Sequence, residues 1–67
     1  MMQIRLNGDR RDISDGATVA DLVTELGLRP EQVAVELNRK LVARSSRSNV
    51  ALQPGDELEF VTLVGGG

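Results

Sequence analysis

The chain has 67 residues and a formal net charge of −2, and it contains no cysteine, histidine, tryptophan or tyrosine. Cysteine and histidine are the usual nucleophiles, general bases and zinc ligands, so their absence disfavours a self-contained hydrolase, transferase or metalloenzyme. The mildly acidic charge and the single aromatic residue, Phe60, disfavour a nucleic-acid binder, which needs a basic face with stacking aromatics.

This length predicts one domain near the lower limit for a core that is stable without disulfides or metal. The sequence has no apolar run long enough to cross a membrane and no signal-peptide pattern at its start. It also shows no internal repeat and no linker. We therefore expect a cytoplasmic protein with neither a nucleic-acid nor a membrane partner.

The first elements in chain order are two strands joined by a tight turn. Residues 2–7 alternate apolar and polar, which is typical of a strand with one buried face. Asn7-Gly8 is a strong hairpin signal because both residue types tolerate a positive φ. The return strand is predicted over residues 10–14, with Ile13 pointing inward, and Asp15-Gly16 ends it as a turn.

One helix follows and begins after Thr18. The Thr18 hydroxyl and the Asp21 carboxylate have the spacing of a capping box. The apolar residues spaced for one helix face are Val19, Leu22, Val23 and Leu26. Gly27 suits the left-handed position after a helix and Pro30 prevents continuation, so the helix is only eight or nine residues and must pack on a sheet.

The second half returns to strands. Residues 33–37 alternate and predict a third strand, Asn38-Arg39-Lys40 predicts a turn, and Leu41-Val42 predicts a short fourth strand. Residues 43–49 have no clear period and predict a loop or a single helical turn. Val50 and Leu52 then return to the core.

The last strand is predicted over residues 57–63, after the turn Pro54-Gly55-Asp56. Leu58 and Phe60 should point into the core, and Glu59 and Val61 should point outward. The resulting order predicts an α+β fold with a mixed four- to five-stranded sheet and one main helix on one face. The first and last strands should lie side by side in the middle of that sheet.

The chain ends in Val64-Gly65-Gly66-Gly67. Glycine loses the most backbone entropy on ordering and has no side chain to pack, so three glycines add no stability. We expect residues 1–63 to form the domain and residues 64–67 to form a flexible arm whose terminal carboxylate is the reactive group. At neutral pH a carboxylate is an anion and a poor electrophile, so activation requires a partner.

The opening Met2-Gln3-Ile4-Arg5-Leu6-Asn7-Gly8, the Pro54-Gly55-Asp56 turn and the glycine end together resemble the ubiquitin-like β-grasp sulfur carriers, in particular the ThiS family of thiamin (thiazole) biosynthesis. The resemblance spans the whole chain, and its most specific part combines the Gly-Asp turn and strand with the glycine tail. Asn38, the basic turn after it and Arg44 also look like the family, but the sequence assigns them no role.

The resemblance implies a chemistry for Gly67. An E1-like, ThiF-like adenylyltransferase would adenylate its carboxylate with ATP. A persulfide donor enzyme would then supply the sulfur of a thiocarboxylate, which a ThiG-like thiazole synthase would consume. Val64, Gly65 and Gly66 would thread a narrow channel of the partner, where the missing Cβ atoms let the walls approach. The chain itself would be no enzyme and would bind no cofactor or metal, because ATP is used by the activating partner.

Other surface residues have simpler interpretations. Phe60 is expected in the core, whereas the outward Val61 and Leu63 could form a partner-docking face beside the tail. The basic residues Arg39, Lys40, Arg44 and Arg47 are interpreted as a solvated edge, with contact to an acidic partner as the alternative. The acids Asp56, Glu57 and Glu59 are either solubilising or face a basic groove of the activating enzyme.

Three alternatives to a thiazole sulfur carrier stay open from sequence. One is a carrier of the molybdopterin-synthase small-subunit type, which shares fold, tail and adenylate chemistry. The second serves another sulfur acceptor. The third is a β-grasp binding module without sulfur chemistry, which would not need Gly67 as a free end.

Overall fold

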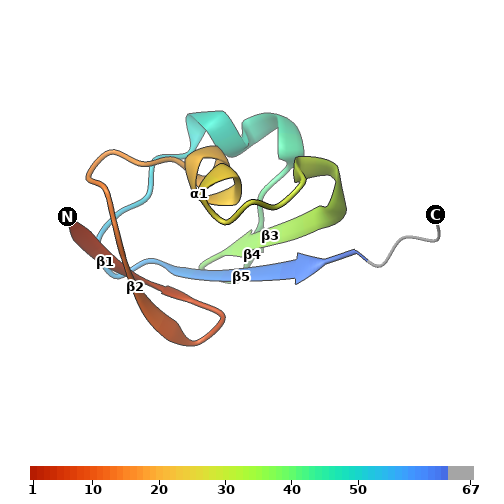
Figure 1. Ribbon diagram of the computed structural model, residues 1–67. Helices are drawn as coiled ribbons and strands as arrows, with labels where there is room; N and C mark the ends of the chain where they lie inside the picture. Colours follow the sequence, from red (N-terminus) through yellow and green to blue (C-terminus); the bar gives the residue numbers. More distant parts are fainter. Residues whose placement is uncertain (64–67) are drawn as a thin grey trace.

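The computed structural model describes residues 1–63, which form a five-stranded sheet covered by one α-helix and two short 3-10 helices (Figure 1). In chain order the elements are β1 (Met2–Leu6), β2 (Asp9–Ile13), α1 (Val19–Glu25), η1 (Pro30–Gln32), β3 (Val33–Leu37), β4 (Lys40–Leu41), η2 (Arg44–Asn49) and β5 (Glu57–Thr62). The strand order in the sheet is β2-β1-β5-β3-β4. The predicted α+β class with a mixed sheet is confirmed.

The β1–β2 hairpin forms as the sequence predicts, but β2 is Asp9–Ile13 and not residues 10–14, because the turn contains only Asn7 and Gly8. Asn7 and Gly8 have φ values of 50° and 87°, the two successive positive values that a tight two-residue hairpin turn needs. The two strands pair antiparallel from Met2 opposite Ile13 to Leu6 opposite Asp9. Ile13 is buried, as expected for its position on the inner face.

Helix α1 forms between its predicted signals, but it has seven residues and not eight or nine, because Leu26 is its C-cap. The Thr18 Oγ1 accepts a hydrogen bond from the Asp21 backbone N–H at 3.1 Å, and the Asp21 carboxylate accepts one from the Thr18 N–H at 2.9 Å. Gly27 follows the last turn with a φ of 71°, in the left-handed region that favours glycine. The helix buries Val19, Leu22 and Val23 against the sheet.

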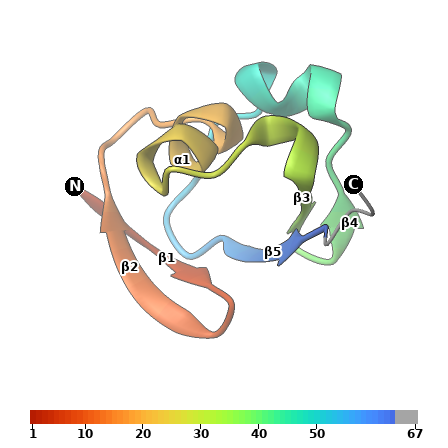
Figure 2. The ribbon, with the colours of Figure 1, turned by 45° about the vertical axis from the view of Figure 1, so that its right-hand side comes forward.

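Strand β5 occupies the centre of the sheet, between β1 and β3 (Figure 2). It runs parallel to β1, with Arg5 opposite Glu57, and antiparallel to β3, with Val33 opposite Thr62. The prediction that the first and last strands are neighbours is therefore confirmed. Parallel neighbours need a long crossover, and here everything from β2 to the Pro54 turn provides it.

Several predictions for the second half need correction, among them the last strand, which is Glu57–Thr62 and not residues 57–63. The fourth strand is Lys40–Leu41, because the turn that precedes it contains only Asn38 and Arg39. Residues 44–49 form a six-residue 3-10 helix, longer than the predicted single turn. Pro30 lies beyond the end of α1 at Glu25 and opens η1, a short helix that the sequence did not indicate, since proline is tolerated in the first turn of a helix.

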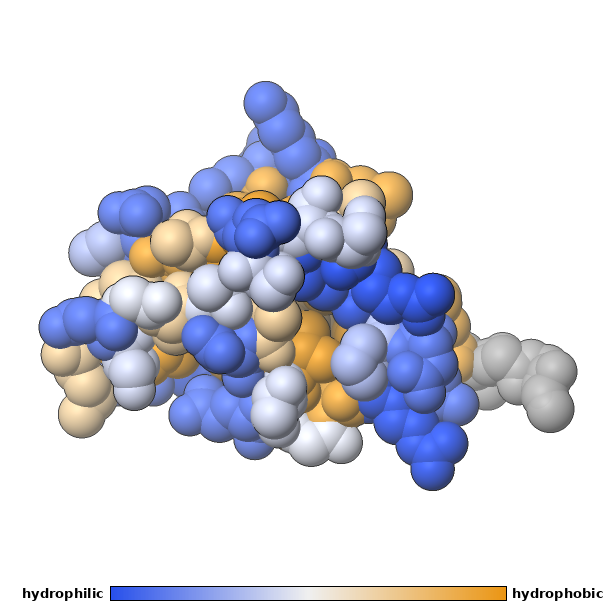
Figure 3. Space-filling model, turned by 90° about the horizontal axis from the view of Figure 1, so that it is seen from above, coloured by the Kyte–Doolittle hydropathy of each residue, from blue (hydrophilic) through white to orange (hydrophobic). Residues whose placement is uncertain are grey.

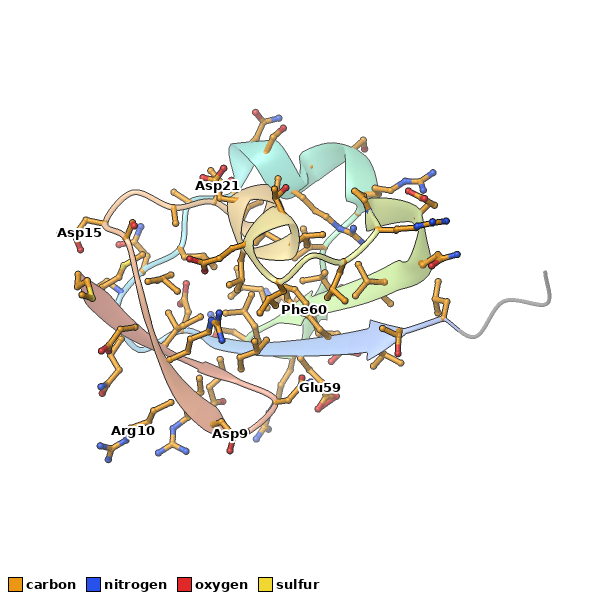
Figure 4. All side chains as sticks on the ribbon, in the orientation of Figure 1. Asp9, Arg10, Asp15, Asp21, Glu59 and Phe60 are labelled. Carbon is orange, nitrogen blue, oxygen red and sulfur yellow. The ribbon has the colours of Figure 1, made fainter. Side chains whose placement is uncertain are left out.

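The two faces of the sheet differ in what covers them. Between α1 and the inner face of the sheet, the core consists of Met2, Ile4, Ile13, Val19, Leu22, Val23, Val33, Val35, Leu52, Leu58 and Phe60. In Figure 4, Phe60 points toward α1 and Glu59 points away from it, as the alternation predicts. On the helical side, hydrophilic side chains project and apolar surface lies between them (Figure 3).

Candidate functional site

The predicted reactive end, Gly67, and the arm of Val64, Gly65 and Gly66 lie outside the described residues. Those assignments, and the division into a domain over residues 1–63 and a tail, stay predictions. The structure does describe the strand that leads to them, β5, as far as Leu63. The candidate site is therefore built from the residues that hold the end of β5.

The end of β5 is held on its β3 side up to the last described residue. Thr62 pairs with Val33, the first residue of β3. The Leu63 N–H then donates to the carbonyl oxygen of Gln32, in η1, at 2.7 Å. Because β3 and η1 are continuous in the chain, both form one support for the point where residue 64 follows.

On the opposite side of β5, the side chain of Asn7 extends the ladder beyond β1. The backbone pairing of β1 with β5 ends at Leu6 and Leu58. The Asn7 Oδ1 then accepts from the Phe60 N–H at 2.8 Å, and its Nδ2 donates to the Phe60 carbonyl at 3.2 Å. One amide side chain thus satisfies both backbone groups of a strand residue, as a neighbouring strand would.

A second asparagine holds the start of β5. The Asn38 Oδ1 accepts from the Glu57 N–H at 3.0 Å, and its Nδ2 donates to the Asp56 carboxylate at 3.1 Å. The same carboxylate accepts from the Gln53 N–H at 2.8 Å, which closes the Pro54 turn. Sequence reasoning placed both Asn7 and Asn38 in turns and assigned neither a side-chain contact with β5. Their shared signal is an asparagine just after a strand.

Val61 and Leu63 are 52% and 51% exposed, so both have the predicted outward position. Ala34 lies opposite Val61 in the ladder, and Leu41, 72% exposed, lies with Ala34 and Leu63 along one groove at the β3–β4 edge. We call Ala34, Leu41, Val61 and Leu63 the exit patch. Leu41 was missed from sequence because a two-residue strand has too few positions to show which face it presents. Partner docking at this patch stays a prediction.

The four basic residues of the second half do not share one environment. Arg39, Lys40 and Arg44 are exposed, in agreement with a solvated edge. Arg47 is only 5% exposed, so the interpretation is wrong for this residue. The reason is η2, whose tight turns direct Arg47 inward, where its guanidinium donates to two backbone carbonyls.

The acidic residues beside β5 also separate. Asp56 is partly buried, and its carboxylate accepts hydrogen bonds from Asn38 and Gln53 at the Pro54 turn, so it has a structural role. Glu57 and Glu59 are exposed, and Glu59 lies directly opposite Glu36 on the outer face. Like charges placed opposite each other destabilise a sheet slightly, but Arg5 and Arg39 line the same hollow as the two glutamates and bring positive charge to it.

Residues 1–63 bring no three His, Cys, Asp or Glu side chains together in a way that could hold a metal ion. Over the same stretch, no helix has both the length and the apolar character needed to cross a membrane.

Comparison with known proteins identifies the family of this chain. The sequence profile of the ThiS family matches residues 4–67. The chain belongs to the ThiS family. A ThiS-family crystal structure, the thiamine biosynthesis protein ThiS from Geobacter metallireducens, superimposes with a TM-score of 0.84 at 29% identity, covering 98% of this chain and 100% of that one. The ubiquitin-like β-grasp fold predicted for the chain is therefore confirmed.

Three curated relatives of this ThiS-family chain are of two kinds that differ in length. The sulfur carrier protein ThiS of Escherichia coli is 29% identical over 98% of this chain and 100% of that protein. The thiazole synthase of Paramagnetospirillum magneticum is 44% identical over 98% of this chain, which spans only 20% of that protein. A second thiazole synthase, from Magnetococcus marinus, is 42% identical and is likewise matched over 20% of its length.

Proposed function

We propose that this chain is a sulfur carrier of thiamin biosynthesis whose reactive group is the terminal carboxylate of Gly67. The observation that carries the proposal is the match with the sulfur carrier protein ThiS of Escherichia coli, which extends over that whole protein. The thiazole synthases that contain a segment like this chain support a thiazole synthase as the sulfur acceptor, and they favour it over the molybdopterin branch.

The proposed chemistry has three steps, all catalysed by partners. An E1-like adenylyltransferase joins the Gly67 carboxylate to AMP and releases pyrophosphate from ATP. The terminal sulfur of a persulfide on a donor enzyme attacks the acyl carbon and displaces AMP. Two electrons from a thiol reductant then cleave the resulting disulfide and leave a thiocarboxylate on Gly67. Since these steps need ATP and a reducing environment, we place them in the cytoplasm.

The described part of the chain would serve as the handle for these partners. Bonds from Asn7, Asn38 and Gln32 hold β5 from both sides, so Leu63 has a defined position relative to the sheet. The exit patch lies beside Leu63 and offers apolar area that a partner can bury. Docking there would bring Val64, Gly65 and Gly66 to the entrance of the partner's nucleotide channel.

Intact-mass spectrometry tests the proposal. The full chain is incubated with the adenylyltransferase of the same organism, ATP, a persulfide donor and a reductant. We expect the mass gain of one oxygen-for-sulfur exchange, localised to Gly67. A chain with Leu in place of Gly66 should show no exchange, because a side chain blocks the narrow channel, yet it should unfold at the same urea concentration. If the unaltered chain is never exchanged, the proposal fails.

A charge on the exit patch tests docking separately. Val61→Asp should raise the KM of adenylation at least roughly tenfold, because a carboxylate would be buried in an apolar contact. Thr24→Asp, which adds the same charge to an exposed position on α1, is the matched control and should leave KM unchanged. Equal KM values for the two variants would remove the exit patch as a docking surface.

A further inference from the structure

Arg47 is the one charged side chain that is buried among residues 1–63. A buried guanidinium is tolerated only when its N–H groups find acceptors, because desolvating the charge is costly. The ion pairs found in the described part of the chain do not include Arg47. Its Nη1 donates to the Pro30 carbonyl at 2.9 Å and its Nη2 to the Val33 carbonyl at 2.6 Å, whereas its Nε has no partner there.

The first consequence concerns the edge of β3. On that edge the Val35 carbonyl accepts from the Val42 N–H at 2.9 Å, which continues the short pairing with β4. The next carbonyl on the same edge, two residues back, is that of Val33. The backbone has already turned away into η2 at this point, and Arg47 supplies the donor instead. Arg47 therefore completes the ladder at the beginning of β3.

The second consequence concerns Gln32. The carbonyls that accept from Arg47 belong to Pro30, two residues before Gln32, and to Val33, the residue after it. The Gln32 carbonyl is the acceptor for the Leu63 N–H. The Arg47 side chain thus binds the backbone on both sides of the Gln32 carbonyl, which is the acceptor for Leu63. Figure 1 shows η1 above this end of β5.

We propose that Arg47 is a positioning residue for sulfur transfer, which acts through Gln32 to set where and in which direction the chain leaves the sheet after Leu63. The inference rests on the proposed function, because the exit direction matters only if a partner must receive the end of the chain. Reacting groups need placement to within about 1 Å, and a misplacement of that size can lower a rate by roughly a hundredfold.

The test uses Arg47→Met, which keeps the length and apolar stem of the side chain and removes every donor. Arg47→Lys keeps the charge but donates from one nitrogen, so it cannot hold both carbonyls in the same geometry. Ile13→Ala is the matched control, since it also removes buried volume but lies in β2, at the edge strand farthest from β4 in the sheet order.

Amide hydrogen exchange on the isolated chain is the first readout. We expect Arg47→Met to speed exchange at Leu63 roughly tenfold more than at Arg5, whose N–H donates to the Asp56 carbonyl at 2.9 Å and reports on the pairing of β1 at the start of β5. Arg47→Lys should lie between Arg47→Met and the unaltered chain. Ile13→Ala should change both amides by the same factor. A purely structural role of Arg47 predicts that pattern for all three variants, and observing it would overturn the inference.

Adenylation kinetics are the second readout. Arg47→Met should lower kcat by roughly tenfold or more with little change in KM, because the exit patch still docks while fewer tails enter the channel correctly. Ile13→Ala should change neither. If Arg47→Met raises KM and leaves kcat unchanged, Arg47 acts in docking and the inference is wrong. If the unaltered chain is not adenylated at all, the proposed function fails, while hydrogen exchange still decides what Arg47 holds.

Discussion

Two turns that begin with asparagine, Asn7-Gly8 and Asn38-Arg39, flank β5 on opposite sides and hold it in different ways. Asn7 binds both backbone groups of Phe60, in the middle of the strand. Asn38 binds the first residue of the strand and the turn before it. Together the two turns hold β5 from its first residue, Glu57, to its middle, Phe60.

The turns also differ in their second residue. Gly8 adopts its φ of 87° at little cost, since glycine has no Cβ. Arg39 has a φ of 72°, a conformation that residues with a Cβ rarely adopt. The residues of the first turn therefore favour its conformation by themselves, whereas contacts elsewhere in the protein impose the conformation of the second turn. Four substitutions, measured as free energies of unfolding in urea, can break or sharpen this comparison.

Asn7→Ala should have the largest effect, a loss of about 2–3 kcal/mol. It removes two partly buried hydrogen bonds to Phe60 and places a Cβ residue without a local hydrogen bond at a φ of 50°. Asn7→Gly is the control, because it keeps the turn and removes only the bonds, so it should cost about half as much. Equal losses for Ala and Gly would mean that backbone strain contributes nothing here.

Gly8→Ala should cost about 1–2 kcal/mol. An added Cβ at Gly8 meets no atom within 4 Å, so steric contact with the rest of the protein contributes nothing. The loss must then come from the positive φ alone. An unchanged urea midpoint would contradict the claim that this turn depends on glycine.

Asn38→Gly should cost about 1 kcal/mol. Glycine tolerates the φ of 51° at this position, so the substitution removes only the two exposed hydrogen bonds, to Glu57 and to Asp56. A loss larger than that of Asn7→Gly would reverse the comparison and make the β3 side the stronger anchor of β5.

Arg39→Gly should have the smallest effect and the opposite sign, a gain of about 0.5–1 kcal/mol. Glycine relieves the strain at φ 72° and gives the Asn-Gly pair that such turns favour. The measurement should use the same urea titration as for Gly8→Ala, since one substitution removes glycine from the second position of a turn and the other introduces it there. A loss of stability would show that the exposed Arg39 side chain makes a contribution larger than its backbone strain.

The first half of the chain was predictable because its signals are local. The capping pair Thr18 and Asp21 and the Asn7-Gly8 turn each act within four residues, and the structure contains both features. The second half was less so. The residues of η2 are polar throughout, so no apolar period indicates that Arg47 turns inward. Its two acceptors lie 14 and 17 residues away in the chain, beyond the reach of a local pattern.

The candidate site divides in the same way. Alternation along the last strand correctly placed Val61 and Leu63 on the outer face, because side-chain direction in a strand has a period of two. Alternation could not assign Leu41 to the same patch, since that placement depends on the pairing of β4 with β3.

By itself, the sequence determined the fold class and the placement of the first and last strands side by side in the middle of the sheet. It did so because periodicity, capping and turn preferences are properties of neighbouring residues. Only the tertiary structure decided how Leu63 is held. Leu63 donates to the carbonyl of Gln32, and Arg47 donates to the carbonyl of the adjacent Val33, so these residues, distant in the chain, meet only when β3 pairs with β5.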